Sequence, residues 1–253
     1  MADRFTSRTW TVRPRNASNE GIHNDAAAQR LGFRGAFVPG VTLYENLVVG
    51  LLTQDAAWLS HGRTEMNFRR PVYDVDEMTF TINSETQGWQ LASEGEPRPR
   101  AYGVLQFDSE PPLIPTGQLV PKDGKPLGDP AQVGALMESA VEFPAERMEA
   151  AAKASGFPLS GSPRVVPAGL WTNPVDMLHA YFDCPVTIHL TSRIWHQSPL
   201  LEHEILQKRG QIIGFEERNG NRIVHFNAEL TASGRPIATI AHSSVYRMRD
   251  ARE

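Results

Sequence analysis

The sequence predicts an α+β protein of two strand-rich halves, with a long apolar helix in the first half that a curved sheet wraps. Short runs of β-branched and aromatic residues dominate both ends of the 253-residue chain, as expected for half-buried strands. Residues 41–59 are apolar on almost every face of a helix. Such a helix must be covered on several sides, and a curved sheet covers it most economically. The two ends of the chain also share a faint repeat.

The repeat has an offset of 128 residues, about half the chain. In each copy a proline follows an aromatic and basic strand, and acidic residues lie three and five positions after it. The copies are FRRPVYDVDEMTF around Pro71 and WHQSPLLEHEILQ around Pro199. This spacing favours a duplicated unit.

In the first half, residues 8–13 alternate as a strand does, and residues 25–31 predict a short helix that ends at Gly32. The long apolar helix begins after Pro39. Four further strands are expected at residues 64–68, 77–84, 89–93 and 102–107.

The middle and the second half follow a similar plan. Residues 111–163 are rich in Pro, Gly, Lys and Ala, with one helix expected at 145–154, and we interpret them as a connector. A short helix at 174–182, capped by Asn173, precedes strands at 187–195, 204–217, 222–230 and 235–247. The expected hairpin turns are Asn219-Gly220 and Ser233-Gly234. The predicted units are therefore 1–110, the connector 111–163, and 164–253.

Composition excludes several classes of function. With 25 basic and 29 acidic residues the net charge is −4, which argues against nucleic-acid binding. Cys184 is the only cysteine, so an internal disulfide framework and a Cys-based zinc site are excluded. The histidines lack metal-binding spacings, and we expect no metal and no other cofactor. No apolar run reaches about 20 residues and no signal-peptide core begins the chain, so we expect a cytoplasmic protein without membrane contact.

Residues 16–47 carry the strongest indication of chemistry. His23 lies just before the short helix, and a histidine suits proton transfer near neutral pH. Gly40 and Val41 begin the long helix. Their backbone N–H groups and the helix dipole can stabilise an enolate or thioester oxyanion.

This segment resembles the hydratase-2 or MaoC-like family. The resemblance rests on His23-Asn24-Asp25, Ala28, Gly32-Phe33 and Gly40, with weaker likeness in RRPVYDVDE and in the C-terminal strands. It implies a hot-dog fold, here duplicated as a double hot dog, in which each antiparallel sheet wraps a helix. It also implies hydration or dehydration of acyl thioesters of coenzyme A or acyl carrier protein. Because hot-dog sheets extend edge to edge, a homodimer is a further expectation.

The chain departs from the family motif D-x-N-P-x-H. With His23 as its histidine, Ser18 stands at the aspartate position and Glu20 at the asparagine position. A serine cannot act as a carboxylate base. We therefore expect His23 to be assisted by Glu20 or Asn19, with Ser18 contacting the substrate.

Two residues one turn into the long helix are further candidates. Glu45 is a rival base, because acyl-CoA thioesterases of this fold place a carboxylate on the same helix. The alternative is a structural ion pair of Glu45 with Arg69 or Arg70. Tyr44, beside it, is expected to contact the substrate. The arginines are also candidates for binding the phosphates of coenzyme A.

The sequence is thus interpreted as a MaoC-like hydratase or dehydratase acting on a 2-enoyl or 3-hydroxyacyl thioester. His23, Glu20, Asn19 and Glu45 are the candidate catalytic residues. Gly40, Val41, Tyr44 and Ser18 are the candidate substrate-binding residues. Two rivals stay open: another acyl-thioester reaction on the same scaffold (hydrolysis, isomerisation or cyclisation), and a non-catalytic acyl-binding subunit. An all-β binding module is the alternative fold.

Overall fold

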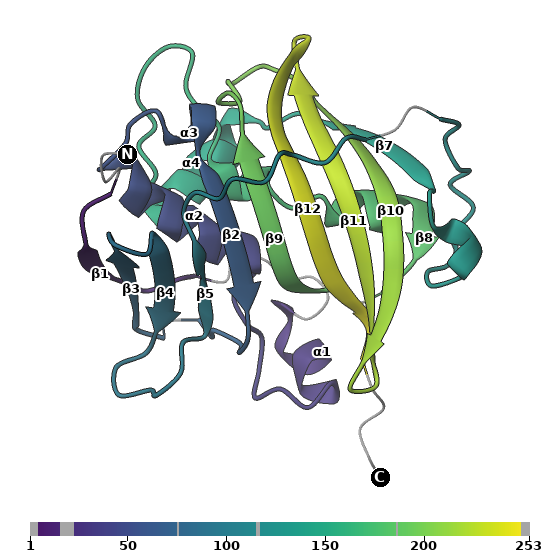
Figure 1. Ribbon diagram of the computed structural model, residues 1–253, viewed down its shortest axis with the longest axis horizontal. Coiled ribbons are helices and arrows are strands. Elements are labelled where there is room, and N and C mark those ends of the chain that lie inside the picture. Colours follow the sequence, from purple (N-terminus) through teal and green to yellow (C-terminus); the bar gives the residue numbers. More distant parts are fainter. Residues whose placement is uncertain (1–4, 16–22, 75, 115–116, 186, 249–253) are drawn as a thin grey trace.

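Ten strands form one continuous antiparallel sheet in the computed structural model, which describes residues 5–15, 23–74, 76–114, 117–185 and 187–248. The strand order is β1-β3-β4-β5-β2-β9-β12-β11-β10-β7 (Figure 1). The first half contributes β1 (Arg8–Val12), β2 (Arg63–Phe68), β3 (Met78–Asn83), β4 (Gly88–Ala92) and β5 (Ala101–Val104). The second half contributes β7 (Leu136–Val141), β9 (Ile188–His196), β10 (Leu206–Arg218), β11 (Asn221–Ala232) and β12 (Arg235–Arg247). A separate parallel pair joins β6 (Lys125–Pro126) to β8 (Phe182–Asp183).

The two halves have the same strand order when counted outward from the central pair. Strands β2, β5, β4, β3 and β1 on one side correspond to β9, β12, β11, β10 and β7 on the other. The 128-residue offset of the repeat holds at two boundaries. Strands β2 and β9 end at Phe68 and His196, and β3 and β10 begin at Met78 and Leu206. The topology therefore repeats with the sequence.

Strands β2 and β9 join the halves into a single sheet. Their register places Thr64 opposite Ile194 and Glu65 opposite Arg193. Thr64 and Ile194 are fully buried. The Arg193 guanidinium donates to Glu65 at 2.7 Å, which forms a partly exposed ion pair across the join.

Helix α2 (Gly40–Leu52) is the apolar helix that the sequence predicts, and it is buried on most faces. It ends at Leu52, so the expected range 41–59 is too long. The chain turns at residues 53–55, where the Asp55 carboxylate accepts a hydrogen bond from the Ala57 N–H at 3.0 Å. A separate short helix, α3 (Trp58–His61), follows.

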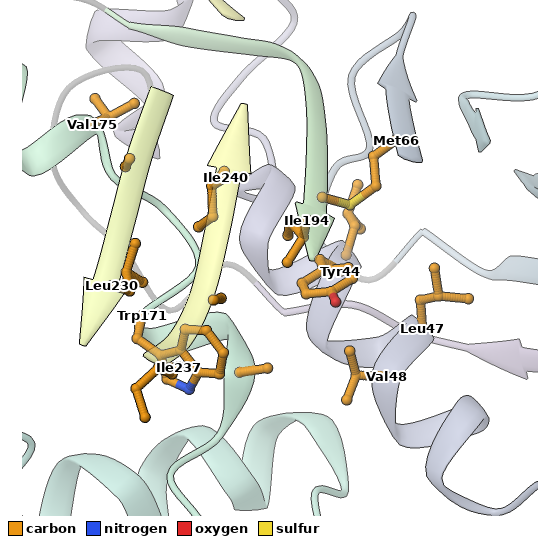
Figure 2. Close-up of a cluster of buried hydrophobic side chains, with 14 of the residues drawn as sticks. Tyr44, Leu47, Val48, Met66, Trp171, Val175, Ile194, Leu230, Ile237 and Ile240 are labelled. Atoms are coloured by element: carbon orange, nitrogen blue, oxygen red, sulfur yellow. The ribbon is translucent and has the colours of Figure 1, made fainter. Parts of the chain in front are cut away.

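The core runs without interruption through both halves. Figure 2 draws Tyr44 of α2 in the same buried cluster as Ile194, Trp171 and Ile237 of the second half. All four are almost completely buried. Burial at this scale is the main favourable term in folding, and because the core is shared, the two halves are expected to fold together.

The segment 111–163, expected to be a connector, contains part of the second half. Strand β7 pairs with β10 over six positions and takes the place that β1 has in the first half. The sequence analysis missed it because this short strand lies within a segment rich in Pro and Gly, and its pairing with β10 depends on a distant part of the chain. Helix α4 (Ala145–Ser155) lies where a helix was expected.

The second half has a shorter helix than the first. Helix α5 (Val175–Tyr181) has seven residues and follows the 3₁₀ turn η3 (Ala168–Leu170). Its expected cap, Asn173, accepts from the Val175 N–H at 3.2 Å, while the N-cap position itself falls on Pro174. In the described residues, no helix combines the length and the apolar character that crossing a membrane requires.

Both predicted hairpin turns are confirmed. Asn219 and Gly220 have φ values of 54° and 77°, and Ser233 and Gly234 have 50° and 75°. Two consecutive residues with positive φ form the turn whose twist matches that of the flanking strands. The turns set the register of three long strands, β10 to β12, and residues of β11 and β12 line the cavity described next.

Candidate functional site

A cavity of about 320 Å³ lies where the two halves meet, at the N-terminus of α2. The end of β2 and the beginning of α2 contribute from the first half, and the beginning of β9 and the end of β12 contribute from the second. These strand ends lie together near α1 (Asp25–Arg30) in Figure 1. The lining is mainly apolar, with Phe33, Phe37, Phe68, Val72 and Ile188, and a few polar groups interrupt it. Such a lining is typical of a small-molecule site.

His23 is one of those polar groups, and the backbone fixes its ring. Its Nδ1 lies 2.6 Å from the carbonyl oxygen of Phe37. A carbonyl only accepts, so Nδ1 carries the proton and Nε2 is the basic nitrogen of the neutral ring. Burial lowers the pKa of His23, and the bond to Phe37 partly offsets this effect. His23 is thus held in a form that can accept a proton.

The residues after His23 hold this loop in place. Asn24 caps α1 by accepting from the N–H groups of Ala26 and Ala27, at 3.1 and 3.4 Å. The Asp25 carboxylate accepts from the N–H of Ala36 at 2.7 Å. This bond links the start of α1 to the segment that carries Phe37, and so to the partner of His23.

The N-terminus of α2 opens onto the same cavity. Its N-cap residue is Pro39, which offers no side-chain cap. The N–H groups of Thr42 and Leu43 donate to the Pro39 carbonyl at 3.0 and 3.3 Å. The first N–H groups of a helix, here those of Gly40 and Val41, have no carbonyl within the helix to bind. Both residues line the cavity, so their N–H groups can stabilise a negative charge there.

A second imidazole, which sequence analysis left aside, also lines the cavity. His189 of β9 lies against Gly40, and a Cβ atom on Gly40 would lie only 2.7 Å from its Nδ1. Only glycine fits here without moving the histidine. On the other side of the ring, Nε2 lies 2.7 Å from the hydroxyl of Ser192.

Tyr44 and Glu45 are not among the described residues that line the cavity. The Tyr44 hydroxyl lies 2.5 Å from Nε2 of His196 in the core, and burial raises its pKa. Glu45 is 3 % exposed and accepts from the N–H of Gly169. Burial raises the pKa of Glu45 to about 8. Both side chains therefore tie α2 to the second half.

The two arginines reach the cavity but have partners of their own. Arg69 donates to the Tyr102 hydroxyl at 3.0 Å, and Arg70 pairs with Glu96 at 3.4 Å. The structural alternative considered for Glu45, an ion pair with one of these arginines, is therefore wrong. Ser18, Asn19 and Glu20 lie outside the described residues.

Solved structures show which fold this arrangement belongs to. The chain matches a conserved hypothetical protein from Mycobacterium tuberculosis, reported to have a double hot-dog fold, with a TM-score of 0.65, 11 % identity and 95 % coverage of both chains. The protein is a double hot dog. The fold class predicted from the sequence is confirmed.

Other structural neighbours differ in their named activities. A MaoC-like dehydratase matches with a TM-score of 0.59 and 12 % identity over 95 % of this chain and 97 % of its own. A protein from Lactobacillus plantarum named as an oleoyl thioesterase matches with a TM-score of 0.53 and 8 % identity over 97 and 98 %. The sequence matches no protein-family model and no curated protein. The fold is shared, and the activity must be argued from the site.

The double hot dog brings together residues that sequence reasoning treated separately. His23, Gly40 and Val41 meet at one cavity, as do Arg69 and Arg70. His189 was missed because alternation along a regular strand puts positions 189 and 192 on opposite faces. A β-bulge at Leu190 changes this: His189 pairs with Ser244 and Thr191 with Ser243, so one residue is extra.

Chemically, the site offers proton transfer beside a helix N-terminus. Among the described residues, no group of three or more His, Cys, Asp or Glu side chains is placed to hold a metal ion. A basic imidazole nitrogen, two backbone N–H donors and an apolar wall suit a reaction that places negative charge on a carbonyl oxygen.

Proposed function

We propose that the protein is a hydro-lyase that hydrates a 2-enoyl thioester, or dehydrates the corresponding 3-hydroxyacyl thioester, of coenzyme A or acyl carrier protein. One observation carries the proposal: His23, with its proton on Nδ1, and the uncapped N-terminus of α2 line the same cavity. Structural neighbours that are named as MaoC-type dehydratases support the proposal, because they share this scaffold.

In the proposed hydration, the thioester oxygen accepts hydrogen bonds from the N–H groups of Gly40 and Val41. A water oxygen bonds to C3, its proton passes to Nε2 of His23, and the C2=C3 electron pair moves to give an enolate with its charge on the thioester oxygen. C2 then takes the proton from Nε2 as the carbonyl re-forms. One water has been added and His23 is neutral again. Dehydration runs through the same steps in reverse.

The residues just before His23 complete this proposal. We assign to Glu20 and Asn19 the task of holding the water, since the motif aspartate position is occupied by Ser18. Ser18 is proposed to contact the substrate. Arg69 and Arg70 are proposed to contact the phosphates of the carrier, because both reach the cavity from the end of β2.

The proposal is tested by incubating the protein in D₂O with saturated and 2-unsaturated acyl-CoA thioesters and analysing the products by mass spectrometry. Addition of one water with deuterium at C2 supports a hydratase. Release of free acid indicates a thioesterase instead. Deuterium exchange without addition indicates an isomerase or cyclase, and binding without turnover indicates a non-catalytic acyl-binding subunit.

A matched pair of variants assigns the activity to the site. His23→Ala is expected to lower kcat by roughly 10²-fold or more, the usual range for loss of a general acid–base group. His203→Ala removes an exposed histidine that is not among the cavity residues and is expected to keep full activity. Equal activity of both variants would remove His23 from the mechanism.

We also propose that the protein forms a homodimer through a sheet edge. Among the described residues, no strand lies beside the outer edge of β1, and such edges favour pairing. The outer edge of β7 is partly covered by Leu119 and by the Tyr181 hydroxyl, so we assign the contact to β1. Light scattering during size-exclusion chromatography tests this, and a monomer at micromolar concentration would contradict it.

A further inference from the structure

His189 occupies a position that the proposed reaction makes important. The ring lies against the first residue of α2, with Nδ1 on the side of Gly40. It packs on Phe68, with the ring centroids 4.6 Å apart. The Nδ1 edge of this imidazole therefore lies at the same helix terminus as the N–H groups of Gly40 and Val41.

The other edge of the ring begins a chain of hydrogen bonds within the second half. His189 Nε2 lies 2.7 Å from Ser192 Oγ, which lies 2.8 Å from His242 Nδ1. His242 Nε2 lies 2.7 Å from Ser244 Oγ. Ser192, His242 and Ser244 are each at most 2 % exposed.

This chain restricts where the protons are. Each serine hydroxyl donates once, and each neutral imidazole has one donor and one acceptor nitrogen. Burial lowers the pKa of His189 to about 3, although a hydrogen bond with the Thr191 backbone opposes this effect. Burial also holds the pKa of His242 well below its ordinary value, so both rings are neutral at neutral pH. If Ser192 donates to Nε2 of His189, then His242 donates to Ser192, and Ser244 donates to His242. In this arrangement Nδ1 of His189 carries a proton toward the helix terminus.

An anionic oxygen at the α2 N-terminus selects this arrangement, because a donor at Nδ1 is attracted to it and a lone pair is repelled. We propose that His189 donates a hydrogen bond from Nδ1 to the thioester oxygen, and that the Ser192–His242–Ser244 chain is the positioning network that fixes this tautomer. The inference rests on the proposed function, since it adds a third donor to the oxygen that Gly40 and Val41 bind.

A neutral donor has a specific advantage at this place. Its hydrogen bond strengthens as charge develops on the oxygen, so it stabilises the transition state more than the bound substrate. A charged imidazolium would oppose the positive end of the α2 dipole. The buried serine and histidine groups keep the ring uncharged while supplying its second hydrogen bond.

Two amide substitutions separate this role from a structural one. In His189→Asn the amide can stand where Nδ1 is, and in His189→Gln it can stand where Nε2 is. A donor to the substrate predicts that His189→Asn keeps more of the kcat, whereas His189→Gln loses 10²- to 10³-fold, the range found for removal of one oxyanion donor, with little change in KM. If the ring serves only to hold Ser192, His189→Gln keeps more of the kcat than His189→Asn, and the inference is overturned.

The matched control is His225→Gln. His225 lies on β11, bonds to Ser243 at 2.8 Å and pairs with Glu216 at 3.3 Å, and is not among the described cavity residues. Its kcat is expected to equal that of the unmodified protein. Tm is recorded for every variant, and only variants within a few degrees of the unmodified protein are compared.

Ser192→Ala supplies a second test if the His189 variants fail to fold. It should lower kcat while KM changes little, and an unchanged kcat would overturn the inference.

A spectroscopic measurement keeps the inference separate from the proposed reaction. A non-reactive saturated acyl-CoA labelled with ¹³C at the thioester carbonyl is bound, and its carbonyl stretching frequency is read by infrared difference spectroscopy. We expect a shift to lower frequency that His189→Gln reduces and His225→Gln keeps.

The outcomes separate the two proposals. If the shift depends on His189 but no water is added to any enoyl thioester, the donor role stands and the hydro-lyase proposal fails. If water is added and neither the shift nor kcat changes in His189→Gln, the inference fails alone. Absence of a bound carbonyl signal would overturn both.

Discussion

His189 of β9 lies against Gly40, the first residue of α2, so closely that a Cβ atom on Gly40 would be 2.7 Å from the imidazole Nδ1. The two residues are 149 positions apart and belong to different halves of the double hot dog. Their contact places the helix terminus of one half against a strand of the other. The site is therefore a property of the duplicated fold.

This contact predicts the effect of Gly40→Ala. The added methyl group would meet both His189 and Phe68, the latter at 3.1 Å. We expect a loss of about 1–3 kcal/mol in the free energy of unfolding, as found when tightly packed sites are overfilled, and a loss of activity. Urea unfolding and kcat measure the two effects. Gly214→Ala is the control, since a Cβ there meets nothing within 4 Å; equal behaviour of the two variants would contradict the contact.

The lowered pKa of His23 predicts the pH dependence of the reaction. The proposed base is the neutral form of His23. This form is present above the pKa that His23 has in the folded protein, which lies below 6.5. We therefore expect kcat/KM for hydration to be highest near pH 8 and to fall with decreasing pH, with the midpoint of the fall below 6.5. A fall centred above pH 7 would show that another group sets the activity.

Three buried histidines predict sensitivity to acid. Burial lowers the pKa of His189 and His196 to about 3, and that of His242 well below 6.5. Between these values and 6.5 the unfolded chain binds more protons, so stability falls as the pH decreases. Each histidine contributes up to about 2 kcal/mol between pH 7 and 5.

Urea unfolding at pH 7 and pH 5 measures this loss. His196→Gln removes one of the three titrations and is expected to reduce the loss by about 2 kcal/mol. An identical pH dependence in the variant and the unmodified protein would mean that His196 does not titrate on unfolding.

The raised pKa of Glu45 predicts the opposite dependence of stability on pH. With a folded-state pKa of about 8, the folded protein binds more protons than the unfolded chain between about pH 4.5 and 8. Stability should therefore fall as the pH rises through this range, by at most about 1.4 kcal/mol per pH unit.

Glu45→Gln tests this directly, because the amide has the shape of the protonated acid and can still accept from Gly169. We expect the variant to be more stable than the unmodified protein at pH 8 and to keep its hydratase activity. Loss of thioester hydrolysis in this variant, with hydrolysis shown by the unmodified protein, would instead favour the thioesterase alternative.

Local patterns in the sequence were enough to predict much of the fold. The all-round apolar character of α2, the alternation in the strands and the turn residues Asn219-Gly220 each specify a structure within a few residues of itself. The 128-residue repeat added the duplication. For the same reason the sequence located Gly40 and Val41 at a helix start, since helix termini depend on neighbouring residues.

What the tertiary structure decided depends on contacts between distant segments. Strand β7 exists because β10 pairs with it, and Glu45 faces Gly169 because η3 packs on α2. The bulge at Leu190 turns His189 toward Gly40 and toward the same face as Ser192. One extra residue in a strand moves every side chain beyond it to the opposite face of the sheet. The alternation of residues along the sequence does not show where such a bulge occurs. The sequence by itself determined most of the elements and placed His23, Gly40 and Val41 as site residues, and the packing of the two halves determined which side chains meet inside the cavity.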